Sequence, residues 1–141
     1  MTSYCPSLVF LALVVWREAR GESSECMQAV AHSVLNRVYK PSWWGDCVMT
    51  VIFKKWQYSS MTDPNDKQLT TWPDRKSTSW TQALIVSDLA LRGITDHPAP
   101  GADSYHDISI PAPYWATSEN FVRQIGRIKF YNVDLDTENG I

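Results

Sequence analysis

Hydrophobic residues dominate the start of the chain, where positions 6–16 read PSLVFLALVVW without a charged side chain. Pro6 is tolerated in the first turn of a helix, and Gly21 can take the left-handed conformation that ends one. The pattern therefore predicts a core helix from Pro6 to Arg20. Its apolar run is too short to span a bilayer, which takes about 20 residues, and it lacks the basic segment and cleavage site of a signal peptide.

The clearest periodic pattern in the chain predicts a second helix. Ser23 and Ser24 suit its N-cap, Glu25 falls in its first turn, and Pro41 ends it. Apolar residues recur along one face at helical spacing: Met27, Val30, Ala31, Val34, Leu35 and Val38. This helix is expected to present that face to the core.

The middle of the chain is less regular. We expect a short helix and then an extended segment within residues 48–60, followed by a turn-rich loop over residues 61–74. A third helix is predicted over residues 79–92, with Gly93 after its end. The helical positions of Trp16 and Trp80 favour core packing for both side chains.

The last third of the chain predicts most of the β-structure. Residues 96–113 are rich in proline, which favours a loop with one short strand around Tyr105. Ser118 can cap a final short helix to Gln124. Residues 127–133 read as a strand, so a small hairpin is expected. Together these patterns predict a single domain over residues 1–141, mainly α (α+β).

Composition excludes several functional classes. The 141 residues are 44% hydrophobic, enough for one core, and the net charge of -2 gives no basic surface for nucleic acid. No stable membrane insertion is expected. Cys5, Cys26 and Cys47 have no CxxC spacing, so reduced thiols are the expectation, although one pair could be bridged.

Three carboxylates follow the first apolar run: Glu18, Glu22 and Glu25. Glu18 continues the apolar line of Val14 and Val15, so its carboxyl should be partly desolvated and its pKa raised, as a proton donor requires. The alternative is that Glu18 pairs with an arginine at a solvated helix end. Glu22 is either a second catalytic carboxylate or an acceptor that holds the turn, and Glu25 suits the helix dipole.

The three histidines raise the alternative of a zinc amidase. His32, His97 and His106 match no compact ligand motif, so we expect neither a metal nor another cofactor.

Four segments, in order, resemble the cell-wall hydrolases typified by spore cortex-lytic enzymes, which also occur as phage endolysins. The first is WREARGESSECMQAVAHSVLNRV at 16–38, similar to the family's EARGE and the helix that follows it. The others are VIFKKWQYSS at 51–60, SYHDISIPAPYWA at 104–116 and, more weakly, IGRIKFY at 125–131. Two positions depart from the family pattern: Ile128 where His is common, and Met61 where Trp is common.

This resemblance implies a lysozyme-like helical domain that cleaves peptidoglycan glycan strands between N-acetylmuramic acid and N-acetylglucosamine. It makes Glu18 the general acid and implies that five residues contact the sugars: Gln57, Tyr58, Ser59, Tyr105 and His106. Loop aromatic residues are further candidates for sugar stacking: Trp43, Trp44, Trp72, Tyr114 and Trp115.

The resemblance favours a lytic transglycosylase, in which Glu18 acts as acid and then as base. A hydrolytic muramidase would need a second carboxylate, for which Glu22 is near and Asp63 and Asp66 are remote candidates. Two further candidate functions are a zinc-dependent N-acetylmuramoyl-L-alanine amidase and a non-catalytic peptidoglycan-binding module. We expect a monomeric phage endolysin, made in the host cytoplasm without a signal peptide and acting on the cell wall.

Overall fold

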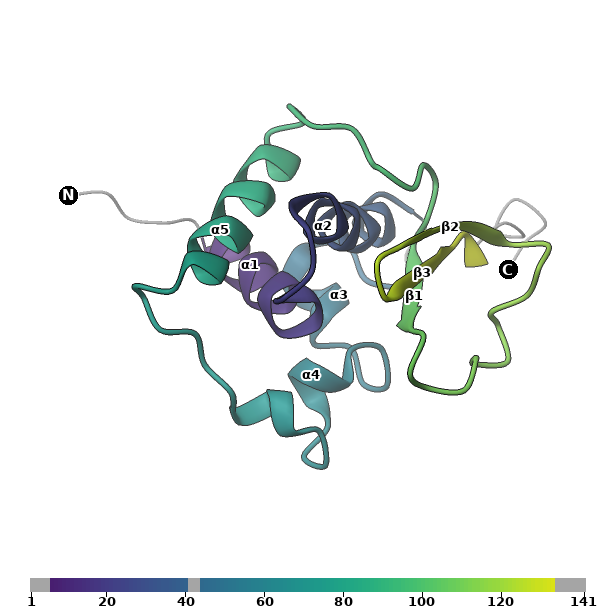
Figure 1. The fold of residues 1–141 in the computed structure, drawn as a ribbon, viewed down its shortest axis with the longest axis horizontal. Coiled ribbons are helices and arrows are strands. Elements are labelled where there is room, and N and C mark those ends of the chain that lie inside the picture. Colours follow the sequence, from purple (N-terminus) through teal and green to yellow (C-terminus); the bar gives the residue numbers. More distant parts are fainter. Residues whose placement is uncertain (1–5, 41–43, 134–141) are drawn as a thin grey trace.

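The computed structural model describes residues 6–40 and 44–133, which form a helical part and a small sheet beside it (Figure 1). Cys5, Pro41 and Trp43 lie outside the described residues. The elements in chain order are α1 (Pro6–Ala19), α2 (Ser24–Tyr39), α3 (Val48–Ile52), α4 (Ser59–Thr62), the 3-10 helix η1 (Lys67–Thr70), α5 (Thr78–Leu91), β1 (Ser104–Asp107), β2 (Phe121–Ile125) and β3 (Ile128–Tyr131). The structure thus confirms a mainly helical α+β fold.

The core is built where α1, α2 and α5 pack against one another. Leu11 and Val14 of α1 and Val30 of α2 are fully buried there, as the two apolar patterns predicted. Gly21 has a φ of 89° and separates the two helices. Ser23 caps α2, its side chain accepting from the backbone nitrogen of Cys26 at 3.1 Å.

Helix α5 closes the core from a third side. Ser77 caps it by accepting from the backbone nitrogen of Trp80 at 3.2 Å, and Gly93 follows its end with a φ of 70°. Trp80 packs against the core. Trp16 is buried and donates from Nε1 to Ser79 Oγ at 2.9 Å, so both tryptophans have the predicted core role.

The sheet has the antiparallel order β1-β3-β2, with β3 in the centre. The predicted strand around Tyr105 and the hairpin are confirmed. The final helix predicted to Gln124 was wrong, because residues 121–125 form strand β2 and pair with β3 through a turn at Gly126. The extended segment predicted after α3 was also wrong, since a turn and then α4 follow.

Two further features of the described residues bear on the predictions. Cys26 is a buried free thiol and Cys47 an exposed one. No helix in the described part of the chain is long and apolar enough to cross a membrane.

Candidate active site

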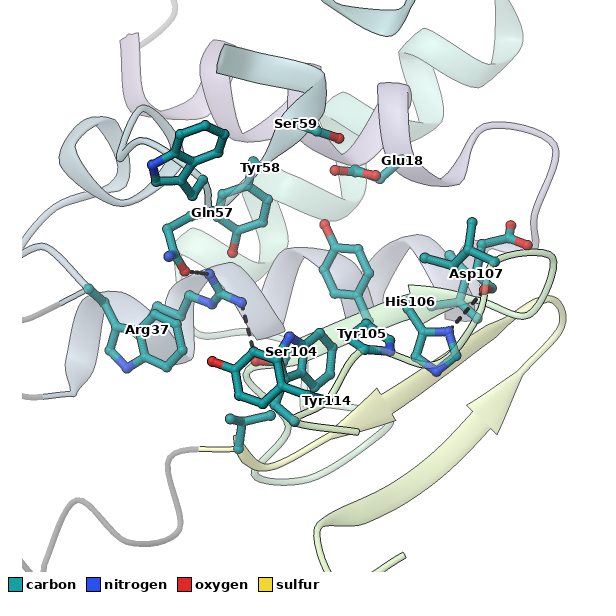
Figure 2. Close-up of a pocket in the computed structure, with 17 residues that line it drawn as sticks. Glu18, Arg37, Gln57, Tyr58, Ser59, Ser104, Tyr105, His106, Asp107 and Tyr114 are labelled. Atoms are coloured by element: carbon teal, nitrogen blue, oxygen red, sulfur yellow. Dashed lines mark hydrogen bonds between the residues drawn. The ribbon is translucent and has the colours of Figure 1, made fainter. Parts of the chain in front are cut away.

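A cleft of about 700 Å³ lies between the helical part and the sheet (Figure 2). One wall comes from the end of α1, from α2 and from the segment that leads into α4. The other comes from β1, β3 and the loop between β1 and β2. The lining residues are Glu18, Arg37, Trp44, Trp56, Gln57, Tyr58, Ser59, Ser104, Tyr105, His106, Asp107, Ile110, Pro113, Tyr114, Trp115, Ile128 and Val133. All six residues that the sequence predicted for the catalytic acid and the sugar contacts are among them.

Glu18 reaches the cleft from the last turn of α1. Its side chain is half-buried, and Ser60 Oγ donates to its Oε1 at 3.1 Å. Burial raises the pKa of Glu18 from 4.5 to about 7, and the nearby Asp66 carboxylate acts in the same direction. The Ser60 and Tyr105 hydroxyls and the Arg37 guanidinium act to lower that pKa. Glu18 can therefore hold a proton near neutral pH.

The arginines beside Glu18 do not neutralise it. Arg17 is buried, and its guanidinium donates to the carbonyl oxygens of Ser60, Leu69 and Thr71 at 2.9, 3.0 and 3.1 Å. Arg20 donates to Gln68 Oε1 at 2.6 Å. The alternative of a solvated Glu–Arg pair at the helix end was therefore wrong. Instead, Arg17 fixes residues 60–71 against α1 and so places Ser60 beside Glu18.

Tyr58 and Tyr105 face each other across the cleft, with ring centroids 6.5 Å apart. Both hydroxyls are buried and make no close hydrogen bond within the described residues, although that of Tyr105 is near enough to the Glu18 carboxylate to lower its pKa. Figure 2 shows the Tyr105 hydroxyl pointing toward Glu18. Burial raises the pKa of Tyr58 to about 12 and that of Tyr105 well above its ordinary value, so both remain donors. Buried donors without a close acceptor are unfavourable unless a ligand accepts their hydrogen bonds.

Arg37 of α2 joins the two walls of the cleft. It donates to Gln57 Oε1 at 3.0 Å on one wall, and to Ser104 Oγ at 3.2 Å and the Asp103 carbonyl at 2.6 Å on the other. Its guanidinium also lies over the rings of Trp44 and Tyr58, at 4.1 and 4.8 Å. Arg37 thereby fixes the orientation of Gln57.

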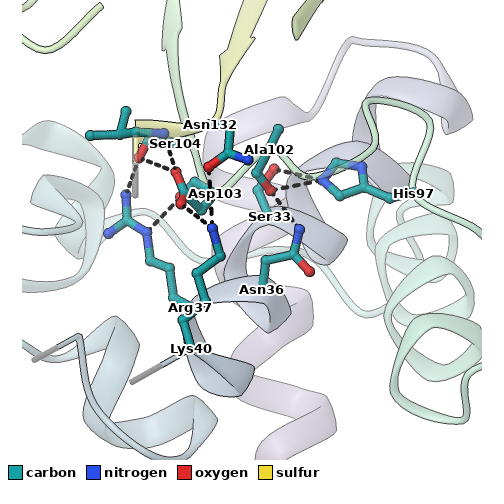
Figure 3. A network of polar contacts seen from close by, with 10 residues as sticks. Ser33, Asn36, Arg37, Lys40, His97, Ala102, Asp103, Ser104 and Asn132 are labelled. Carbon is teal, nitrogen blue, oxygen red and sulfur yellow. Dashed lines mark hydrogen bonds and ion pairs between the residues drawn. The ribbon is translucent and has the colours of Figure 1, made fainter. Parts of the chain in front are cut away.

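A buried polar network supports Arg37 from behind (Figure 3). Lys40 Nζ contacts Asp103 Oδ2 at 2.8 Å, and Asp103 Oδ1 accepts from Ser104 Oγ at 3.0 Å and from the backbone nitrogen of Val133 at 2.9 Å. Asp103 is fully buried. These contacts tie β1 and the residues after β3 to helix α2, so the two walls cannot move apart without breaking them.

The predicted sugar-contacting His106 lines the cleft, but both of its ring nitrogens already have partners. Nδ1 lies 2.9 Å from the carbonyl oxygen of Asp107, and Nε2 lies 3.1 Å from the hydroxyl of Tyr131. The ring is buried and stacks on Tyr131, with Trp115 against its edge. In this arrangement His106 supports the cleft wall.

The predicted second carboxylate, Glu22, is not among the cleft-lining residues. Its Oε1 accepts from the backbone nitrogen of Arg127 at 2.9 Å, in the β2–β3 turn. The structure thus makes Glu22 a hydrogen-bond acceptor, but for the turn between β2 and β3 and not for the turn between the two helices where the sequence placed it. Asp63 and Asp66 do not line the cleft either, and Asp66 accepts from Ser59 Oγ at 2.6 Å.

Asp107 is the carboxylate that lines the cleft together with Glu18. Partial burial acts to raise its pKa, but hydrogen bonds from Ser109 and the Arg127 guanidinium outweigh burial and lower it. Asp107 is therefore ionised where Glu18 is protonated. Sequence reasoning missed Asp107, although it directly follows the Tyr-His pair of the third segment.

The loop aromatics divide into two groups. Trp44, Tyr114 and Trp115 line the cleft as expected, whereas Trp72 does not and lies instead against Arg17, at 4.7 Å from ring centroid to guanidinium carbon. Trp56 also lines the cleft. Nothing in the local sequence pattern had distinguished it from the residues around it.

The three histidines are not brought together. His32 and His97 stack with centroids 5.5 Å apart, on the α2 side of the loop that precedes β1, while His106 lies in the sheet. Among residues 6–40 and 44–133 no group of three or more His, Cys, Asp or Glu side chains could hold a metal ion.

Two solved structures share the fold of this chain. One is the catalytic domain of the germination-specific lytic transglycosylase SleB from Bacillus anthracis, with a TM-score of 0.69, 24% identity, and coverage of 93% of this chain and 98% of that one. The other is the catalytic domain of the Bacillus cereus SleB protein, with a TM-score of 0.70, 25% identity, and coverage of 93% and 94%. These matches confirm the lysozyme-like fold of the SleB domains.

No curated protein matches the sequence. The family described as Cell Wall Hydrolase matches residues 21–131. This segment contains the residues of the predicted sugar-contacting set and begins after Glu18. Because the match spans most of the chain, the protein belongs to the Cell Wall Hydrolase family.

Proposed function

We propose that this protein is a lytic transglycosylase that cleaves peptidoglycan between N-acetylmuramic acid and N-acetylglucosamine, with Glu18 as its general acid and base. The observation that carries the proposal is the half-buried Glu18 carboxyl, which faces the cleft with a pKa raised to about 7. The SleB domain from Bacillus anthracis, which shares the fold, is described as a lytic transglycosylase.

The proposed reaction begins when protonated Glu18 donates its proton to the glycosidic oxygen. The bond between that oxygen and the anomeric carbon of the muramic residue breaks, and the leaving sugar takes the proton. The 6-hydroxyl of the same muramic residue then attacks the anomeric carbon and gives its proton to the Glu18 carboxylate. The product is a 1,6-anhydro sugar, and Glu18 is again protonated.

Four of the other residues predicted to contact the sugars bind and orient the strand, whereas His106 supports the cleft wall. The buried hydroxyls of Tyr58 and Tyr105, which make no close hydrogen bond within the described residues, donate to substrate oxygens near Glu18. Gln57, fixed by Arg37, offers its amide group to the sugar, and Ser59 lines the same wall. Glu22 is expected to stabilise the fold and not to contact the substrate.

A hydrolytic muramidase is the second candidate, and Asp107 is the observation that favours it. An ionised carboxylate and a protonated one in the same cleft are the pair that glycoside hydrolysis uses. In that reaction Asp107 would activate water or attack the anomeric carbon.

Digestion of purified peptidoglycan by the wild type, Glu18→Gln and Asp107→Asn, followed by mass spectrometry, separates the candidates. Anhydro-muramic ends from the wild type and from Asp107→Asn, but not from Glu18→Gln, would support the transglycosylase. Ends heavier by one water, lost in Asp107→Asn, would establish the muramidase. Free stem peptides and inactivation by a chelator would point to a zinc amidase, and binding without any cleavage to a binding module.

The biological setting proposed with this activity is that of a phage endolysin, acting as a monomer on the bacterial cell wall. Expression of the protein in the bacterial cytoplasm, with and without a membrane-permeabilising holin, tests this role. Lysis that depends on the holin is expected. Lysis without the holin would contradict the proposal that the protein reaches the cell wall through a separate pore.

A further inference from the structure

Two aromatic side chains on the cleft walls are exposed to solvent. Trp56 is 81% exposed and Tyr114 is 96% exposed, although both line the same cleft as Glu18. Trp56 precedes the segment of Gln57 and Tyr58 on the helical wall, and Tyr114 lies in the loop between β1 and β2 on the facing wall. Large aromatic rings gain free energy by burial, so this placement indicates a surface that a ligand covers.

The backbone at Trp56 is strained in a way that glycine would relieve. Its φ is 73°, and it is the one residue other than glycine with positive φ among residues 6–40 and 44–133. The backbone nitrogen of Gln57 donates to the Lys54 carbonyl at 3.2 Å, which places Trp56 at the third position of a turn. Type II turns take glycine at this position. A tryptophan kept there, with its ring in solvent, points to function and not to stability.

Tyr114 is presented by a loop whose neighbouring residues are fixed. The backbone nitrogen of Ala116 donates to the Pro113 carbonyl at 3.0 Å, so Tyr114 lies within a turn. Trp115 packs edge-on against His106 and Tyr131, and its carbonyl accepts from Asn120 Nδ2 at 2.7 Å. The loop is therefore anchored directly after Tyr114, while the Tyr114 ring itself stays exposed.

We propose that Trp56 and Tyr114 are sugar-stacking residues of a binding subsite for the N-acetylhexosamine rings of the glycan strand, away from the bond that Glu18 cleaves. This inference rests on the proposed function. The C–H faces of a pyranose ring are apolar and pack on aromatic faces, and edge groups of the sugar need polar partners. Gln57 lines the cleft directly after Trp56 and supplies such a group through its amide nitrogen, and Figure 2 shows Tyr114 well apart from Glu18.

Binding to purified insoluble peptidoglycan, measured by sedimentation in the Glu18→Gln background, tests the subsite without turnover. We expect Trp56→Gly and Tyr114→Ala each to raise the Kd about 10-fold, and Trp56→Phe to recover most of the loss. Trp56→Gly relieves the positive φ, so its melting temperature should equal or exceed that of the parent. Tyr39→Ala is the matched control, because Tyr39 is 71% exposed and does not line the cleft.

Kinetics in the otherwise wild-type enzyme give a second readout. Both variants should raise KM for peptidoglycan and leave kcat within about twofold, since neither ring touches the reacting atoms. If the parent binds and cleaves peptidoglycan while both variants bind as tightly as the parent, the subsite is wrong and the proposed function stands. If the parent neither binds nor cleaves peptidoglycan, the proposed function fails and the subsite with it.

Discussion

At the scale of single residues, the pKa of Glu18 sets the pH dependence of the proposed reaction. A general acid must be protonated, so activity should fall about tenfold per pH unit as the pH rises above about 7. Ser60 donates to the Glu18 carboxylate and lowers its pKa. Ser60→Ala should therefore raise the pKa further and move the alkaline limb of the kcat/KM profile to higher pH. An unchanged alkaline limb in this variant would show that another group controls it.

The same raised pKa makes Glu18 a source of instability at alkaline pH. The folded protein holds this proton up to pH about 7, whereas the unfolded chain releases it near pH 4.5. The stabilisation from Glu18 is therefore complete below about pH 4.5 and is lost as the pH rises through about 7. Glu18→Gln should raise the free energy of unfolding by about 1–2 kcal/mol at pH 8, allowing for solvent access from the cleft. Urea unfolding of both proteins at pH 5 and 8 measures this, and a variant less stable than the wild type at pH 8 would contradict it.

At the scale of elements, the β2–β3 hairpin is joined to the α1–α2 turn by Glu22. The carboxylate accepts from the backbone of Arg127, and a Cβ at Gly126, whose φ is 57°, would collide with it. Glu22→Gln keeps an acceptor and should retain near wild-type activity, whereas Glu22→Ala should lower the free energy of unfolding by about 1–2 kcal/mol. Melting curves and peptidoglycan clearance check both variants. Loss of activity in a stable Glu22→Gln would restore Glu22 as a catalytic candidate.

The elements also show where local patterns predict structure and where they do not. The helices α1 and α2 follow from apolar periodicity and from Gly21, because burial of one face and the helix ends are local properties. Strand β2 does not follow, since the sequence after Ser118 also suits a helix. Pairing with β3 across the Gly126 turn decides its conformation, and this pairing is a property of the tertiary structure.

At the scale of the whole molecule, the candidate site follows only partly from the sequence. Glu18 could be predicted because it continues an apolar line within its own helix. Arg37 also carried a local signal, since it lies three residues after Val34 on the apolar side of α2. Trp56 carried none and Asp107 only its position after the Tyr-His pair, because the place of both in the cleft depends on how the sheet and the α3–α4 segment meet across the cleft.

Stability in acid depends on a histidine that packs the loop before β1 onto α2. His97 Nε2 lies 3.0 Å from the Ala102 carbonyl, and Nδ1 accepts from the backbone nitrogen of Ala99 at 3.1 Å, so the ring is neutral with its proton on Nε2. Burial lowers the pKa of His97 from 6.5 to about 4. Between these values the unfolded chain binds a proton that the folded protein does not, so the free energy of unfolding should fall as the pH drops from about 6.5 to 4.

As the pH falls, His97 lowers the free energy of unfolding while Glu18 raises it over the same pH range. Comparing variants separates the two contributions. In a Glu18→Gln background, adding His97→Gln removes the titrating ring while its amide can still donate to Ala102. The difference in unfolding free energy between the single and the double variant should shrink by about 2 kcal/mol between pH 7 and 4. A difference independent of pH would show that His97 is protonated as readily in the folded protein as in the unfolded chain. The lowered pKa would then be wrong, and the packing of this loop would not limit stability in acid.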